Sequence, residues 1–313
     1  MVRYEYPFSK KQNMDKCVLA LGFFDGVHLA HRDLLECARK EATENGLNFG
    51  IFSFKSNGKI KTSSQRLYND DEKTEIFHNL NADFVVFADF DQIAHLSAED
   101  FVNKVLIEDL NCSLCVAGFN FRFGHRACGR ADDLVRLMKI GGGDAIIRDE
   151  VKVDGEKTLS ATLIRDMLAE GKIPEATKLL GAPYYIKGRV SQGRQVGRVL
   201  GFPTVNIPIS EEKIKPRLGV YRTAIPIDGK IYSAVTNIGI CPTFDKREIH
   251  LESFIIDFDG DLYGKDLKIY LLDFIRDERA FSSPEELKMQ INIDKNTVIK
   301  ENGDITWQDL GLK

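Results

Sequence analysis

Residues 17–31 read CVLALGFFDGVHLAH. The apolar run at 17–21 predicts a buried strand, and the apolar residues at helical spacing after it predict a helix over residues 29–45. The same strand-then-helix pattern recurs as far as about residue 180. This alternation predicts an α/β domain in which helices cover a parallel sheet. Ligands of such sheets bind beside the carboxyl ends of the strands.

The second half of the chain has a different pattern, because short strands separated by Gly, Pro and Asp turns replace the alternation. Asp228-Gly229 lies between two of these strands and predicts a hairpin. Strands at this spacing predict a closed, mostly-β barrel, and Ser283-Pro284 predicts the start of a C-terminal helix. The length of 313 residues also favours two domains, which we expect to be residues 1–181 and 182–313.

Composition narrows the class of protein. Hydrophobic residues make up 43% of the chain, and the formal net charge is −4. A chain with this charge lacks the broad basic surface typical of nucleic-acid-binding proteins. It also lacks an apolar run of the roughly 18 residues that a membrane span needs, and its first residues do not read as a secretory segment. We therefore expect a cytoplasmic protein without nucleic-acid or membrane partners, whose six cysteines are reduced.

The turn after the first apolar run has the residues of a phosphate-binding site. His28 and His31 share one face of the first helical turn, beside the positive end of the helix dipole. Their N–H groups are suited to stabilise charge on the α-phosphate of a nucleotide. The expected ATP-binding residues of the turn are Gly22, Phe24, Asp25 and Gly26. The alternative is that both histidines cap the helix or face solvent.

Two later segments of the first half also carry polar groups near predicted strand and helix ends. Ser160 and Thr162 are suited to cap a helix, and with Arg165 they are suited to hold a triphosphate. The segment 118–124 reads GFNFRFG and follows a predicted strand. Aromatic residues at alternate positions are most often core residues. With Asn120, however, the rings of Phe121 and Phe123 are also suited to hold a flat ligand.

A glycine-rich segment marks the second half. Its glycines lie within fourteen residues, at 188, 193, 197 and 201, and we expect Gly188, Gly193 and Gly197 to approach the phosphates of ATP. Thr204 and Asn206 follow, and in a strand their side chains point to the same side. They are therefore suited to hold one cation or one phosphate. The alternative is a glycine-rich hairpin between surface strands.

Together these motifs resemble those of the prokaryotic bifunctional riboflavin kinase/FAD synthetase family over nearly the whole chain. His28 and His31 match the His-x-Gly-His signature of its nucleotidyltransferase domain, and the GFPTVN segment at 201–206 matches its flavokinase signature, Gly-Phe-Pro-Thr-Ala-Asn. Further matches are Asn120 in Gly-x-(Asn/Asp)-Phe-x-Phe-Gly, and Ser160, Thr162 and Arg165 in the later nucleotidyltransferase motif. The chain departs from the family at Ala30, at Leu163 and at 52–55.

The resemblance implies two activities. In the barrel, riboflavin would be phosphorylated by ATP to FMN, with Glu252 as general base and Asn206 in the catalytic site. Thr204 and Asn206 would bind Mg²⁺, and Arg276 would contact the flavin. In the Rossmann-like nucleotidyltransferase domain, FMN would be adenylylated by a second ATP to FAD with release of pyrophosphate. There His28 and His31 would stabilise the transition state, and Mg²⁺ is again expected.

Two other interpretations stay open at this point. The departures in the first half are compatible with a riboflavin kinase whose N-terminal domain is not catalytic. A flavin- or RNA-binding regulator that uses both folds without turnover is a second alternative. In either case we expect the chain to act as a monomer.

Overall fold

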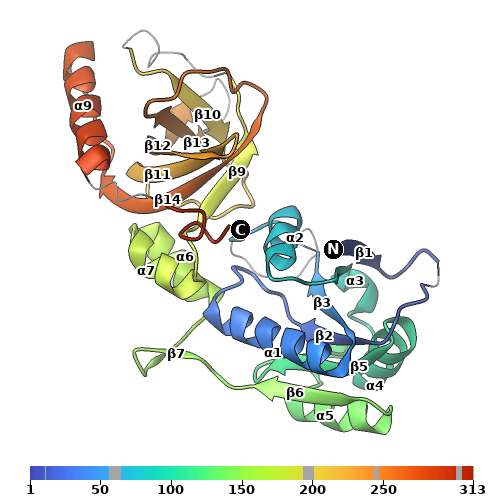
Figure 1. The fold of residues 1–313 in the computed structure, drawn as a ribbon. Helices are drawn as coiled ribbons and strands as arrows, with labels where there is room; N and C mark the ends of the chain where they lie inside the picture. Colours follow the sequence, from blue (N-terminus) through green and yellow to red (C-terminus); the bar gives the residue numbers. More distant parts are fainter. Residues whose placement is uncertain (11, 56–64, 193–200, 243–246, 301–304, 313) are drawn as a thin grey trace. The chain divides into compact units, whose positions relative to one another are not determined.

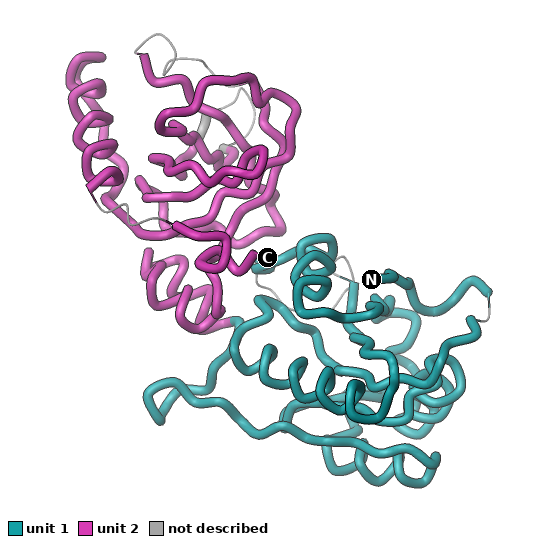
Figure 2. The backbone as a smooth tube through the Cα atoms, in the orientation of Figure 1, with its two compact units in different colours: residues 1–161 teal, residues 162–313 magenta. Residues whose placement is uncertain are grey.

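The computed structural model describes residues 1–10, 12–55, 65–192, 201–242, 247–300 and 305–312. The chain divides into two compact units, Met1–Ala161 and Thr162–Lys313 (Figure 2). Each unit has its own main sheet and its own apolar core. The sequence placed the domain boundary after Gly181, so the helices between residues 161 and 180 fall on different sides of the two divisions.

The first unit is built on a six-stranded sheet in which all neighbouring strands are parallel (Figure 1). The strand order is β1-β4-β3-β2-β5-β6. The strands are β1 (Val2–Tyr6), β2 (Cys17–Leu21), β3 (Asn48–Phe54), β4 (Phe84–Ala88), β5 (Cys112–Gly118) and β6 (Asp144–Arg148). This sheet confirms the predicted parallel α/β fold.

Helices of different lengths connect these strands. They are α1 (Leu29–Asn45), α2 (Asp70–Asn79), α3 (Phe90–Ile93), α4 (Ala98–Asp100), the π-helical η1 (Phe101–Asp109), the 3₁₀ turn η2 (His125–Ala127) and α5 (Ala131–Ile140). A small hairpin of β7 (Lys152–Val153) and β8 (Lys157–Thr158) follows β6. Residues 98–109 are helical throughout, as α4 followed directly by η1.

The side chains of β2 alternate between two apolar clusters, one on each face of the sheet. Val18 lies in the cluster that contains Leu35 of α1, whereas Leu19 lies in the cluster that contains Leu134 of α5. Every residue of β2 is buried. A strand buried on both faces needs a continuous apolar run rather than an alternating one, which is what residues 17–21 provide.

The central position of β2 defines where a ligand is expected. β2 lies between β3 and β5: from β2 the chain winds through β3 to β4 on one side, and it then crosses to β5 and β6 on the other side. In open α/β sheets the binding crevice lies at the carboxyl ends of the strands on either side of such a point. The loops at 22–28 and 119–124 both begin at this edge of the sheet.

The second unit is an antiparallel sheet with strand order β10-β13-β12-β11-β14-β9. Its strands are β9 (Tyr185–Arg189), β10 (Thr204–Pro208), β11 (Gly219–Ile227), β12 (Lys230–Pro242), β13 (Arg247–Ile255) and β14 (Asp266–Arg276). The two outer strands meet where the Ser191 amide donates to the Asn206 carbonyl oxygen at 2.8 Å. The sheet therefore nearly closes on itself, which confirms the predicted barrel.

Helices flank this sheet in the sequence. They are α6 (Ala161–Glu170), α7 (Ile173–Leu180) and α9 (Pro284–Lys300). Val298 of α9 packs in a cluster with Val220 and Val235 of the sheet. The Glu286 amide donates to Ser283 Oγ at 3.2 Å, so Ser283 caps α9 as predicted. Within the described ranges, no helix combines the length and the apolar character needed to cross a membrane.

Candidate functional site

The turn after β2 has an unusual backbone that several contacts hold in place. Phe24, Gly26 and Val27 all have positive φ, at 52°, 86° and 42°. Such values are rare for a β-branched residue and persist only where the surroundings enforce them. The Ser53 hydroxyl donates to the Phe23 carbonyl oxygen at 3.0 Å. The turn is therefore a built structure and not a loose connection.

Gly22 and Asp25 have structural reasons to occupy their positions. A Cβ atom on Gly22 would lie 2.8 Å from the Phe24 ring, so a larger residue would displace that ring. The Asp25 carboxylate accepts a hydrogen bond from the Leu67 amide at 3.0 Å. Both residues were predicted to bind ATP, which stays a prediction; these contacts show that they shape the turn.

His28 and His31 form a stacked pair at the start of α1. Their ring centroids are 3.7 Å apart and their planes differ by 15°. Both Nδ1 atoms are buried, and neither has a hydrogen-bond partner among the residues that the structure describes. Burial lowers the pKa of His28 to about 4 and holds the pKa of His31 well below its ordinary value. Both imidazoles are therefore neutral near pH 7, and His28 is not solvated.

The N-terminus of α1 is open to an anion. His28 occupies the cap position, but its side chain makes no capping hydrogen bond within this fully described helix, and the first turn carries no acidic residue. The first amides of a helix lack partners inside the helix and favour negative charge. With the two neutral imidazoles, they form a set of N–H groups suited to phosphate oxygens.

The other residues of the first half that were predicted to bind ligands differ in their exposure and lie in different parts of the fold. Asn120 is exposed, and Phe123 is buried in the core, where its ring stacks on Phe121 at 5.8 Å. Phe123 also lines a cavity of about 450 Å³ with aromatic and basic neighbours, among them Phe54, Phe90, Phe101, Arg122 and His125. Arg165 donates to the Thr162 hydroxyl at 3.1 Å on α6. Ser160 belongs to the first unit, whereas Thr162 and Arg165 belong to the second.

In the second unit, strand register brings three polar residues into one row. Asn206 on β10 faces Glu252 on β13, and Glu252 faces Asn237 on β12. Residues directly opposite each other in adjacent strands point to the same face of a sheet. Thr204, two residues before Asn206, lies on that same face beside Phe254. The predicted residues Thr204, Asn206 and Glu252 are therefore neighbours in the fold.

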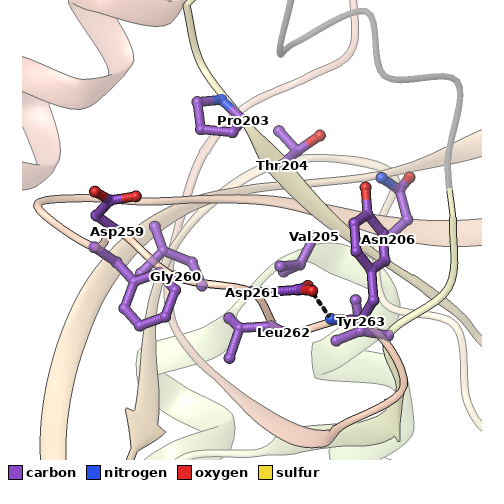
Figure 3. Close-up of a pocket in the computed structure, with 12 residues that line it drawn as sticks. Pro203, Thr204, Val205, Asn206, Asp259, Gly260, Asp261, Leu262 and Tyr263 are labelled. Carbon is purple, nitrogen blue, oxygen red and sulfur yellow. Dashed lines mark hydrogen bonds between the residues drawn. The ribbon is translucent and has the colours of Figure 1, made fainter.

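Thr204 lines two cavities. The smaller, of about 210 Å³, also has Glu252, Asn237 and Arg276 in its wall, together with aromatic rings and residues of α9. The larger, of about 720 Å³, is lined by β10 and by the loop at 258–263 (Figure 3). In that loop the Tyr263 amide donates to Asp261 at 2.9 Å. A ligand in each cavity would thus reach Thr204 from one side.

Arg276 is held in the wall of the smaller cavity by α9. Its guanidinium donates to both carboxylate oxygens of Asp294, the shortest distance being 2.7 Å. Asp294 is 2% exposed and accepts a further hydrogen bond from Gln290 at 2.7 Å. A bidentate pair of this kind fixes the plane of the guanidinium. Sequence reasoning predicted Arg276 but missed Asp294, because nothing in the pattern of α9 distinguishes it from a solvent-exposed aspartate.

Of the three glycines predicted to approach the phosphates of ATP in this half, the structure describes Gly188. A Cβ on Gly188 would lie 2.4 Å from Ile207 Cγ2, so this glycine lets β9 and β10 approach each other. Gly193 and Gly197 lie outside the described residues. Among the described residues, no three or more His, Cys, Asp or Glu side chains cluster as metal ligands. Oxygen groups of Thr204 and Asn206 suit Mg²⁺, which usually takes few protein ligands and completes its shell with phosphates and water.

Comparison with known proteins covers both units. Family descriptions match in two places, FAD synthetase over residues 10–162 and riboflavin kinase over residues 180–301. The bifunctional riboflavin kinase/FMN adenylyltransferase of Bacillus subtilis is 33% identical over 299 residues, which cover 93% of this chain and 94% of that protein. The chain belongs to the bifunctional riboflavin kinase/FMN adenylyltransferase family.

One further relative carries the same name, and a solved structure described by another name shares the fold over nearly the whole chain. The bifunctional riboflavin kinase/FMN adenylyltransferase of Escherichia coli K12 is 34% identical over 289 residues, covering 90% of this chain and 91% of that protein. A Streptococcus pneumoniae crystal structure, described as a macrolide-efflux protein, is 30% identical with a TM-score of 0.86 and covers 96% of this chain and 100% of its own. The predicted family is thereby confirmed, and so is the predicted class of enzyme, a transferase of flavin cofactor biosynthesis.

Sequence reasoning missed part of the larger cavity wall. Asp259, Asp261 and Tyr263 lie between β13 and β14, in a segment that reads as an ordinary turn. A signal was present, because Tyr263 is a large aromatic residue in a polar turn and is 49% exposed in the structure. Exposed aromatic residues beside a cavity are common in ligand sites.

Proposed function

We propose that the chain makes FMN from riboflavin in its C-terminal domain, residues 182–313, and FAD from FMN in its N-terminal domain, residues 1–181, using ATP in both reactions. The observation that carries the kinase assignment is the row Asn206–Glu252–Asn237, with Thr204 between the two cavities. This row places a carboxylate on the same face as the hydroxyl and amide that suit a phosphate-bound cation. The family assignment supports both activities.

In the kinase reaction, riboflavin occupies the smaller cavity and ATP the larger one. The terminal ribityl hydroxyl attacks the γ-phosphorus, the new O–P bond forms, and the bond to the β–γ bridging oxygen breaks to release ADP. Glu252 takes the hydroxyl proton as general base. Arg276, whose plane Asp294 fixes, contacts the flavin. Thr204 and Asn206 would hold Mg²⁺, which offsets phosphate charge when it is bound.

In the adenylyltransferase reaction, the triphosphate lies at the N-terminus of α1. An oxygen of the FMN phosphate attacks the α-phosphorus, and the bond to the α–β bridging oxygen breaks to release pyrophosphate. His28 and His31 donate N–H groups to the charge that builds on the α-phosphate. Ser160, Thr162 and Arg165 hold the triphosphate. Asn120, with Phe121 and Phe123, holds the flavin ring. We expect Mg²⁺ to assist here as well.

We further propose that the functional domains are residues 1–181 and 182–313 and that the enzyme is a cytoplasmic monomer. The five cysteines whose side chains the structure describes are free thiols, which supports a reducing compartment. The net charge of −4 gives no reason to expect a nucleic-acid partner.

A direct assay tests the proposed function. The purified chain is incubated with Mg²⁺, ATP and either riboflavin or FMN, and the flavin products are separated by chromatography. We expect FMN from riboflavin and FAD from FMN. Formation of FMN without any FAD would leave a single-activity kinase, and binding of flavin without consumption of ATP would favour a regulator.

A further inference from the structure

Lys73 is a buried lysine on α2 that the reactions described above do not use. Its side chain is 1% exposed, although lysines are almost never fully buried unless they are paired. Its Nζ lies 3.3 Å from Asp70 and donates to the Phe54 carbonyl oxygen at 3.2 Å. Burial lowers its pKa, and the neighbouring Asp70 opposes this shift. Because burying a charged group is costly, we expect the Lys73 ammonium group to have a role other than filling space in the core.

The aromatic ring of Phe23 covers the ammonium group of Lys73. Lys73 Nζ is 5.1 Å from the centre of the Phe23 ring, and the Arg66 guanidinium is 4.7 Å from the same ring. Phe23 belongs to the turn after β2. Cation–π contacts of this kind strengthen when they are removed from water. Lys73 therefore ties three segments together: α2, the end of β3 through Phe54, and the turn.

The next two residues of the turn also contact this part of the chain. Phe24 packs edge-on against Phe77, with ring centroids 5.9 Å apart, and Phe77 lies one helical turn after Lys73. Asp25 accepts its hydrogen bond from Leu67, just before α2. Three consecutive turn residues thus rest on the segment 66–77, which we call the α2 platform.

The Phe24 ring connects the α2 platform to the histidine pair, because it contacts both Phe77 and His31. The edge of Phe24 packs against His31 at 5.3 Å, and His31 stacks on His28 at 3.7 Å. Phe24 itself has a φ of 52°, so its position needs outside support. The α2 helix is well anchored for this purpose, because Asn69 and Glu72 form a reciprocal capping box at its start.

We infer that Lys73 is a positioning residue for adenylyl transfer: through the α2 platform it fixes the turn that presents His28, His31 and the α1 amides to the triphosphate. The inference rests on the proposed adenylyltransferase function. A misplacement of about 1 Å in a reacting assembly can reduce a rate by about 10²-fold. Lys73 contacts Phe23, Asp70, the Phe54 carbonyl oxygen and the Phe87 ring, the last at 5.0 Å, and none of these four residues is among those proposed to bind substrate.

The test replaces Lys73 with methionine, which keeps the length of the side chain and removes its charge and its donor. FAD formation from supplied FMN is measured at varied ATP, and FMN formation from riboflavin is measured in the same protein. For Lys73→Met we expect kcat/KM for FAD formation to fall at least about tenfold, with a lower kcat because the histidines act on charge that builds during the reaction, and with a higher KM for ATP. FMN formation should stay within about twofold, since distant sites act independently.

Lys104→Met is the matched control. Lys104 also pairs with an aspartate on its own helical segment, at 2.8 Å from Asp100, but it is 61% exposed and far from the turn in sequence. We expect wild-type rates for both reactions. If Lys104→Met lost FAD formation as strongly as Lys73→Met, the special role of Lys73 would be refuted.

A spectroscopic measurement separates positioning from simple destabilisation. The imidazole C2–H resonances of His28 and His31 are recorded by NMR below the unfolding temperature of each variant. We expect both resonances to move in Lys73→Met while the dispersion of a folded protein remains. A folded variant with unchanged histidine signals or unchanged FAD formation would overturn the inference.

A second variant covers the case in which Lys73→Met fails to fold. Phe77→Leu removes part of the ring that supports Phe24 and leaves every charge in place, and we expect the same direction of change in kcat and in KM for ATP. A folded Phe77→Leu protein with wild-type FAD formation would then overturn the inference. A wild-type chain that makes no FAD would refute the proposed adenylyltransferase function itself, which is a different result.

Discussion

Replacing Asp294 with alanine should destabilise the second unit and weaken riboflavin binding. The carboxylate is 2% exposed and accepts hydrogen bonds from Arg276 and from Gln290, both with shortest distances of 2.7 Å. Alanine would leave a guanidinium and an amide without this acceptor in a largely dry setting. The substitution therefore removes the carboxylate of a buried ion pair and leaves the Arg276 guanidinium behind.

The magnitude follows from the burial of the two partners. Breaking a buried ion pair by removal of one partner costs about 3–5 kcal/mol. The Arg276 side chain is 22% exposed, so water recovers part of this loss, and we expect about 3 kcal/mol. For a unit of this size, 1 kcal/mol shifts the unfolding midpoint by about 2–4 °C, which gives a fall of about 6–12 °C.

The chain supplies its own probe for this measurement. Trp307 is its single tryptophan and lies in the second unit, so tryptophan fluorescence during heating or urea unfolding reports on that unit. Asp277→Ala is the matched control, because Asp277 pairs with Arg217 in the same bidentate way but is 64% exposed. We expect the control to cost less than about 1 kcal/mol.

The same variant should raise KM for riboflavin, since Arg276 would lose its fixed orientation in the cavity wall. A loss below about 1 kcal/mol for Asp294→Ala, equal to that of the control, would refute the reasoning. So would an unchanged KM for riboflavin in a folded protein, because Arg276 would then not be the contact we propose.

Two further predictions concern packing and pH. Gly188→Ala should cost the second unit about 1–3 kcal/mol in urea unfolding followed by Trp307 fluorescence, because the new Cβ meets buried Ile207; an unchanged midpoint would contradict this. The first unit should lose stability as pH falls from about 6.5 toward about 4. In this range His28 and His31 bind protons in the unfolded chain but stay neutral in the folded one, because burial lowers their pKa values. Urea unfolding followed by circular dichroism at several pH values gives the free energy of unfolding against pH, and its slope should be shallower for His28→Gln than for the wild type. An identical slope would contradict the neutral state of His28 in the folded protein.

The sequence predicted the elements whose local pattern matches their burial. Residues 17–21 are apolar on both faces of a central parallel strand, and that strand is β2 without a change of bounds. Thr204 and Asn206 do share a face of β10, as period-two alternation requires. The predicted cap of α9 at Ser283 is also present.

What could not be predicted depends on contacts between distant segments. The row Asn206–Glu252–Asn237 needs the register of three strands, and no local pattern sets that register. The neutral state of His28 and His31 depends on the burial of the two imidazoles, which the folded turn creates and which lowers their pKa values. The strand β1 was not predicted, because its polar and aromatic residues resemble an irregular N-terminal segment, and it is a half-exposed edge strand.

The most direct test of two separate sites is Glu252→Gln, with initial rates measured for both reactions in one preparation. We predict that FMN formation from riboflavin falls by about 10²-fold or more, because the general base is lost. FAD formation from supplied FMN should stay within about twofold of the wild-type rate. An equal loss of both activities in a folded protein, or a wild-type rate of FMN formation, would contradict the account.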